Sequence, residues 1–238
     1  MEATGAMSGG GPPASPEAPR EPEPVLGWLA REVEQELPQL RLISCEAHVG
    51  RGEALTAACP GDLRERLRGL SNQFRGARAI GIRREPVPAA YRVFFRQIGL
   101  DPDIEHTPIE AAVRERMLRG GFLPGTLLED ALLIALLDTS IPVWALASEG
   151  IEGPLGIRVS AEGERLGGAP GDPALPGGRL VIADASTPLA VLFGELASLH
   201  VPAADTRRLT LFAVAVAGVP GLYAEEALWI SRTALEHR

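Results

Sequence analysis

The order of helical and strand-like segments most constrains how this chain folds. Before Pro142, apolar residues recur mainly at helical spacing, and after it short β-like runs are separated by glycines. A block of helices followed by a block of strands is typical of domains in which helices cover a sheet and do not alternate with its strands. We therefore expect an α+β fold.

The same patterns predict individual elements. We expect helices over residues 26–37, 62–70, 88–98, 107–120, 127–137 and 225–235. We expect strands over 40–49, 79–83, 179–184 and 209–217, further short strands after Pro142, and a loop over 167–178. The helix near residue 107 has the clearest start, because Thr107 and Glu110 have capping-box spacing and Pro108 stands at the first helical position.

Domain organisation follows from length and composition. Residues 1–24 are rich in glycine and proline and lack apolar periodicity, so we expect a disordered tail there. The remaining residues, 25–238, suit a single domain with one core.

Composition also limits location and chemistry. The longest apolar stretch, 127–147, is interrupted by Glu129, Asp130, Asp138 and Pro142, so we expect no transmembrane helix, and without a secretory signal we expect a cytoplasmic protein. Cys45 and Cys59 are too few for a disulfide scaffold or a zinc site. We therefore expect no metal and no cofactor.

The charge balance disfavours general binding of nucleic acid. All 23 basic residues are arginines, and the net charge is −8. Because non-specific nucleic-acid binding depends on neutralising phosphates, only a local arginine patch could bind RNA. Two neighbouring helices offer such a patch; its candidates are Arg92, Arg96, Arg114, Arg116 and Arg119. Acidic residues lie among them, so ion pairs along solvated helix faces are the alternative.

Three stretches of the chain resemble one known domain. The first is Y-R-V-F-F-R-Q-I-G-L-D-P with P-I-E-A-A-V-R-E-R-M-L-R-G-G-F-L-P, residues 91–102 and 108–124; the second joins L-L-E-D-A, I-P-V-W-A and I-E-G-P-L-G-I-R between residues 127 and 158; the third is A-D-T-R-R-L-T-L-F-A-V, residues 204–214. Together they resemble the B3/B4 region of the phenylalanyl-tRNA synthetase β subunit and its free-standing relatives. The resemblance implies a strand-rich core flanked by helices, and binding of tRNA or aminoacyl-tRNA.

In the synthetase this region hydrolyses mischarged tyrosine from phenylalanine tRNA, but the chain departs from the pattern that this reaction uses. Thr126 and Leu133 stand where the synthetase has asparagines, Trp144 replaces the histidine of P-x-H-A-F-D, and Ala147 replaces its aspartate. The chain therefore lacks the polar side chains that are best placed for this hydrolysis. Aminoacyl-tRNA deacylation is one hypothesis for its activity, and loss of that activity is another.

The resemblance nominates four pocket residues: Thr126, Asp130, Trp144 and Glu152. Asp130 fits the family pattern, with a hydrogen bond that ties its helix to the preceding loop as the alternative. Trp144 offers an apolar wall, and Glu152 could hold an α-ammonium group or serve as a turn residue.

Three functions remain open from the sequence. The first is RNA or aminoacyl-tRNA binding, with hydrolytic editing diverged or lost. The second is a non-catalytic pocket for an amino acid or another small molecule. The third is a protein-interaction module in which Trp144 is part of the core.

Overall fold

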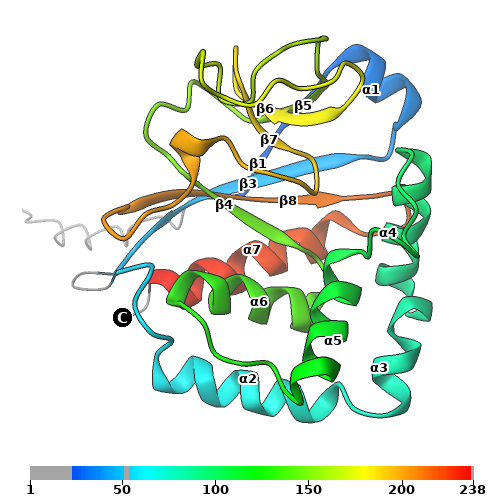
Figure 1. The fold of residues 1–238 in the computed structure, drawn as a ribbon, viewed down its shortest axis with the longest axis vertical. Coiled ribbons are helices and arrows are strands. Elements are labelled where there is room, and N and C mark those ends of the chain that lie inside the picture. The colour runs from blue at the N-terminus through cyan, green and yellow to red at the C-terminus, as the bar shows by residue number, and fades with distance from the viewer. Residues whose placement is uncertain (1–22, 51–53, 237–238) are drawn as a thin grey trace, which may run out of the picture.

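Two β-sheets lie one above the other over a layer of helices in the computed structural model, which describes residues 23–50 and 54–236 (Figure 1). The first sheet has the order β1 (Val25–Leu26), β3 (Arg41–His48), β8 (Arg208–Ala215), β4 (Val143–Ala147) and is antiparallel. The second has the order β2 (Trp28–Leu29), β5 (Gly156–Val159), β6 (Leu180–Ala183), β7 (Pro188–Val191), with only β2 and β5 parallel. The expected α+β fold is confirmed.

The centre of the first sheet is the pair β3 and β8. The two strands are aligned over their full length, from Arg41 opposite Ala215 to His48 opposite Arg208. Most of β8 is buried, as its nearly continuous apolar sequence predicts for a strand covered on both faces. This pair is the platform on which the helices and the second sheet are built.

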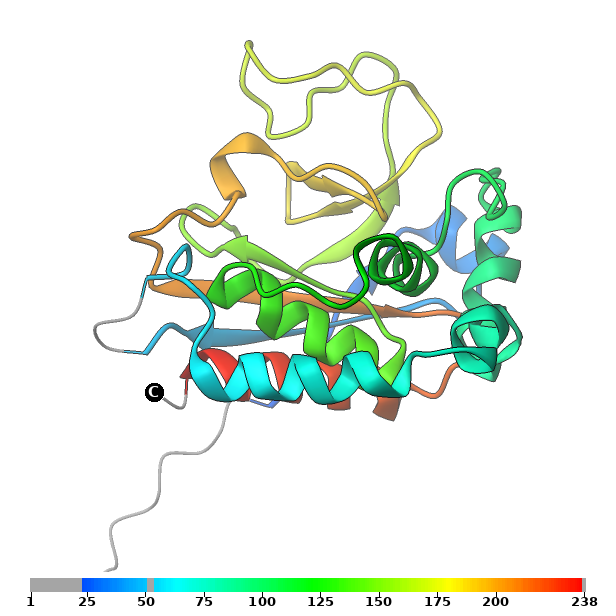
Figure 2. The ribbon, with the colours of Figure 1, turned by 60° about the horizontal axis from the view of Figure 1, so that its bottom comes forward.

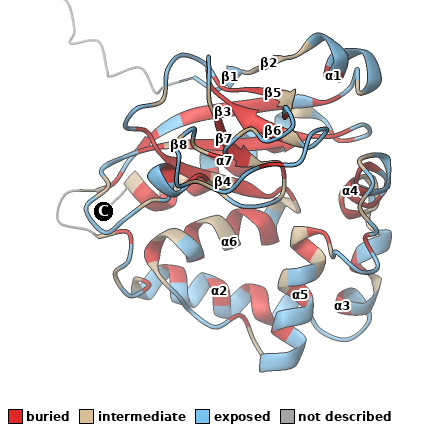
Figure 3. Cartoon of the chain, turned by 45° about the horizontal axis from the view of Figure 1, so that its top comes forward, coloured by how far each residue is buried: buried red, intermediate tan, exposed pale blue. Residues whose placement is uncertain are grey.

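Helices cover the face of the first sheet that points away from the second. Helix α7 (Gly221–Glu236) packs on β3 and β8 and beside α6 (Leu127–Thr139), and α2 (Gly61–Gln73) packs outside α6 (Figure 2). Buried positions concentrate on the strands and on the inward faces of these helices (Figure 3). No helix in the described part of the chain is long and apolar enough to cross a membrane.

The remaining helices lie beside these layers. They are α1 (Arg31–Glu36), α3 (Ala77–Gly81), α4 (Pro86–Gln97), α5 (Pro108–Arg119) and the short 3-10 helices η1 (Ile82–Arg84) and η2 (Ser198–His200). The predicted start of α5 is confirmed, because Thr107 and Glu110 form a capping box before Pro108. Its end is confirmed too: Gly120 has φ 80°, a left-handed conformation that glycine adopts without strain.

Two predicted elements are wrong. The expected helix over 26–37 starts only at α1, because the preceding residues extend both sheets as β1 and β2. Between them, Gly27 donates from its backbone N to the carbonyl of Leu42 at 2.8 Å, and a Cβ at Gly27 would come within 2.5 Å of the carbonyl oxygen of Leu155. Long-range pairing therefore overrides the local apolar spacing.

The expected strand over 79–83 is helical, formed by α3 and η1. No sheet edge accepts these residues in the topology of the described chain, so their backbone hydrogen bonds stay local. Conversely, β7 was not predicted, because it begins at Pro188 in a segment without clear alternation. The expected tail over 1–24 lies outside the described residues except for Glu23 and Pro24.

Candidate functional site

The space beside Trp144 is filled by Phe193. The Phe193 ring centre lies 5.2 Å from that of Trp144, and 6.0, 5.9 and 5.0 Å from those of Tyr91, Phe94 and Phe95. On its other side Trp144 stacks on Phe212, with ring centres 5.5 Å apart and planes 13° apart. We call the rings of Tyr91, Phe94, Phe95, Trp144 and Phe193 the aromatic cluster. Trp144 is therefore packed among other rings.

Thr126 and Asp130 organise the start of α6. Glu129 accepts hydrogen bonds from the backbone N and the hydroxyl of Thr126, at 2.9 and 3.0 Å. Asp130 is buried, and both its carboxylate oxygens accept from the backbone N of Gly125, at 3.1 and 3.0 Å. Trp144 follows the opposite end of α6, which at thirteen residues is about 20 Å long. The structure does not bring these side chains together in one cavity.

Glu152 is exposed, and the hydrogen bond at this residue is formed by its backbone N–H and not by its carboxylate. Its N–H donates to buried Asp184 at 3.0 Å, and Asp184 also accepts from the N–H groups of Ser186 and Thr187. Burial alone would raise the pKa of Asp184, but these backbone hydrogen bonds and nearby His200 together lower it. Asp184 thus anchors the loop that follows β4.

His200 holds the other end of this loop. It is buried, and its Nδ1 lies 3.1 Å from the carbonyl oxygen of Ala147. Residues far apart in the sequence, His200 and Ala147, are brought together only by the fold.

Two of the five candidate RNA-binding arginines are buried. Arg92 donates to Asp103 at 2.6 Å and to Glu110 at 2.7 Å. Burial opposes the charge of Arg92, but its hydrogen bonds and the charges of these two carboxylates raise its pKa. Arg116 donates from Nε and Nη2 to the carbonyl of Ser71, at 3.1 and 2.8 Å. Both guanidinium groups thus tie helices together.

The other three arginines are exposed. Arg96 lies 3.7 Å from Asp103, Arg119 forms an ion pair with Glu115, and Arg114 lies on the same helix as Arg119. Exposed ion pairs of this kind contribute little stability and can exchange partners. Of the five candidates, Arg96, Arg114 and Arg119 therefore remain available for contact with RNA.

A cleft of about 370 Å³ lies on the first sheet, beneath the loop that leads to the second. Three hydroxyl side chains from separate segments line it: Ser44 on β3, Thr210 on β8 and Ser148 after β4. The hydroxyl oxygens of Ser148 and Thr210 are 2.9 Å apart. We call this cavity the hydroxyl cleft. The sequence did not point to it, because only strand pairing brings the three residues together.

The hydroxyl cleft also carries charge and a wall from the loop. Its charged lining residues are Arg208, Glu46 and Glu23. The guanidinium of Arg208 and the carboxylate of Glu46 are 3.7 Å apart, and more than half of each side chain is exposed. Ile151, Gly153 and Pro154 form part of its wall. The segment around Glu152 therefore borders a cavity, although Glu152 itself does not line it.

The described lining of the hydroxyl cleft includes a thiol but no histidine. Burial raises the pKa of Cys45, a further lining residue, to about 11, so its thiol is protonated at neutral pH. No histidine is among the described residues that line this cleft, so its hydroxyls have no imidazole base beside them. Within 23–50 and 54–236, no three His, Cys, Asp or Glu side chains are grouped to hold a metal ion.

Comparison with known proteins shows a partial likeness to a tRNA ligase subunit. No family model matches the chain. It is 35% identical over 111 residues, 46% of its length, to the phenylalanine–tRNA ligase beta subunits of Xanthomonas oryzae pv. oryzae and Xanthomonas euvesicatoria pv. vesicatoria. The matched region spans 14% of the length of those subunits. The chain is therefore similar to one part of the phenylalanine–tRNA ligase beta subunit.

Proposed function

We propose that this chain is a B3/B4-like binding domain that receives the aminoacyl end of an aminoacyl-tRNA in the hydroxyl cleft without hydrolysing it. The hydroxyl cleft is the observation that carries the proposal, because its volume and its three hydroxyls suit a small polar group. Similarity to part of a tRNA ligase subunit supports tRNA as the larger partner.

The rim of the hydroxyl cleft supports binding of a nucleic-acid end. Arg208 and Glu46 form a loose, exposed pair, so a phosphate can replace the carboxylate as partner of the guanidinium. Arg207 precedes Arg208 in the chain, which adds a second positive charge to this segment. The contact is local, as the net charge of −8 requires.

Packing around Trp144 supports binding without hydrolysis. Ester hydrolysis needs a positioned base and donors for the developing oxyanion. At Trp144 the neighbours are aromatic rings, and Phe193 occupies the adjacent space. The described hydroxyl-cleft lining also has no histidine.

Equilibrium binding tests the proposal. Phenylalanyl-tRNA, tyrosyl-tRNA, uncharged tRNA and free phenylalanine are titrated against the wild type, Thr210→Val and Arg208→Ala. The matched control is Arg68→Ala, which removes an exposed arginine on α2. We expect charged tRNA to bind more tightly than uncharged tRNA. Arg208→Ala should weaken both and reduce the salt dependence, and Thr210→Val should remove the preference for charged tRNA.

Each alternative has its own outcome. If Arg96→Ala, Arg114→Ala and Arg119→Ala each weakened tRNA binding equally and Arg208→Ala did not weaken it, the RNA would bind to the face formed by α4 and α5 and not to the hydroxyl cleft. Free phenylalanine that binds as tightly as phenylalanyl-tRNA would make this an amino-acid-binding domain. Binding of none of these ligands would refute the proposal.

A deacylation assay tests the absence of hydrolysis. Release of labelled amino acid from tyrosyl- and phenylalanyl-tRNA is followed with the wild type, Trp144→His and the double variant Trp144→His, Phe193→Ala. We expect no release by the wild type. Release by the double variant alone would show that Phe193 blocks a site that Trp144 has disabled, whereas release by the wild type would contradict binding without hydrolysis.

A further inference from the structure

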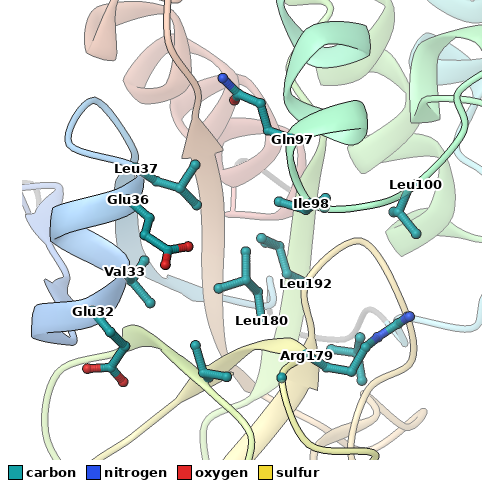
Figure 4. A pocket seen from close by; sticks show the side chains of 13 residues that line it. Glu32, Val33, Glu36, Leu37, Gln97, Ile98, Leu100, Arg179, Leu180 and Leu192 are labelled. Atoms are coloured by element: carbon teal, nitrogen blue, oxygen red, sulfur yellow. The ribbon is translucent and has the colours of Figure 1, made fainter.

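A second cavity lies between α1, the end of α4 and the second sheet, away from the hydroxyl cleft (Figure 4). Its volume is about 260 Å³, and its floor is apolar. Side chains on this floor include Val33, Leu37, Ile98, Leu180 and Leu192. We call this cavity the α1 pocket. A cavity of this size holds about nine waters, so a ligand of small aromatic or branched-alkyl size fills it.

One carboxylate points over this floor. Glu36 extends from α1 toward the leucines of the floor, whereas Arg179, on the opposite rim, extends away from α1 (Figure 4). No hydrogen bond or ion pair engages the Glu36 carboxylate within the described chain. Glu32, one turn earlier on α1, adds a second negative charge to the rim. The α1 pocket thus combines an apolar floor with acidic groups that have no cationic partner.

The α1 pocket continues into a neighbouring cavity of about 230 Å³ that shares Glu36, Leu37 and Gln97 with it. The neighbour is lined by the apolar side chains of Leu40 and Phe94 and by the polar side chain of Gln39. Glu36 therefore lies where the two cavities meet.

We infer that the α1 pocket binds a small organic cation: a primary ammonium group on a compact apolar body. The ammonium group donates to Glu36, and the apolar body covers the leucines. An anion is disfavoured by Glu32 and Glu36, and a neutral ligand would cover the Glu36 carboxylate without pairing it. This inference does not depend on the function proposed for the hydroxyl cleft.

Calorimetric titration of the full chain tests the inference with three probes that share one ring: 2-phenylethylamine, 2-phenylethanol and phenylalanine. We expect the amine to bind and the alcohol to bind at least tenfold more weakly, because a charge-assisted hydrogen bond is worth about a factor of ten or more. Phenylalanine keeps the ammonium group but adds a carboxylate, which Glu32 and Glu36 repel, so it should also bind more weakly than the amine. Added salt should weaken binding of the amine.

Glu36→Gln and Glu34→Gln are the matched variants, because both residues are exposed on α1 and only Glu36 lines the pocket. Glu36→Gln should weaken binding of the amine about tenfold and leave binding of the alcohol unchanged. Glu34→Gln should change neither affinity. No binding at about 10 mM amine, equal affinity for amine and alcohol, or equal loss in both variants would overturn the inference. Thr210→Val should have no effect on the amine, which separates this site from the hydroxyl cleft.

Discussion

An alanine variant is usually more stable than a glycine variant, and at position 193 we expect this order of stability to be reversed. Phe193 has φ 60°, a left-handed conformation that costs a non-glycine residue ~1–2 kcal/mol. Glycine avoids this cost but loses ~0.5–1 kcal/mol more conformational entropy on folding. Both variants lose the ring and its contacts, at ~3 kcal/mol for a half-buried phenylalanine. We therefore expect Phe193→Gly to be more stable than Phe193→Ala by about 0.5–1 kcal/mol.

Urea unfolding followed by circular dichroism measures this difference, and tryptophan emission reports the environment of Trp144 in the same samples. Both variants should unfold at lower urea than the wild type, with equal slopes. If Phe193→Ala were at least as stable as Phe193→Gly, the argument that the turn holds Phe193 in a strained conformation would be refuted. Loss of less than about 1 kcal/mol in both would refute its role as the filler of the aromatic cluster.

Three further predictions follow from packing and charge. Gly156→Ala should lower stability by ~1–3 kcal/mol, because its Cβ would lie 2.0 Å from the Trp28 ring; Gly61→Ala, with nothing within 4 Å, is the control in the same unfolding assay. Asp184 has a lowered pKa in the folded state, so its stabilisation is present above about pH 4 and is lost as the pH falls through the folded pKa; Asp184→Asn should flatten the acid limb of stability measured against pH. Cys45, with a pKa of about 11, should react with iodoacetamide at pH 7 far more slowly than the unfolded chain does, as mass spectrometry will show; equal rates would contradict its burial.

Local signals in the sequence predicted local structure well. The start of α5 depends on Thr107, Pro108 and Glu110, which are near neighbours in the chain. The same capping pattern begins α6 at Thr126 and Glu129, but the family resemblance led us to interpret Thr126 as a pocket residue. A side chain can therefore match a family pattern and yet act as the N-cap of its own helix.

Features that depend on distant pairing could not be predicted. The first residues after the tail have helical spacing, and only Leu42 and Leu155 make Gly27 part of an extended segment. In the same way, Ser44 and Thr210 share the hydroxyl cleft through strand register. A single sequence reports such register weakly, because each residue type is ordinary at its own position.

The extended segment at β1 and β2 also determines the order in which the fold can be completed during synthesis. The indole N–H of Trp28 donates to the carbonyl of Pro154, 126 residues later. At ~5–20 residues per second, the ribosome needs about 6–25 s to make the partner after Trp28 itself. Until then β2 has no partner strand, and the platform of β3 and β8 is completed later still, so the nascent chain should remain exposed to chaperones until β8 emerges.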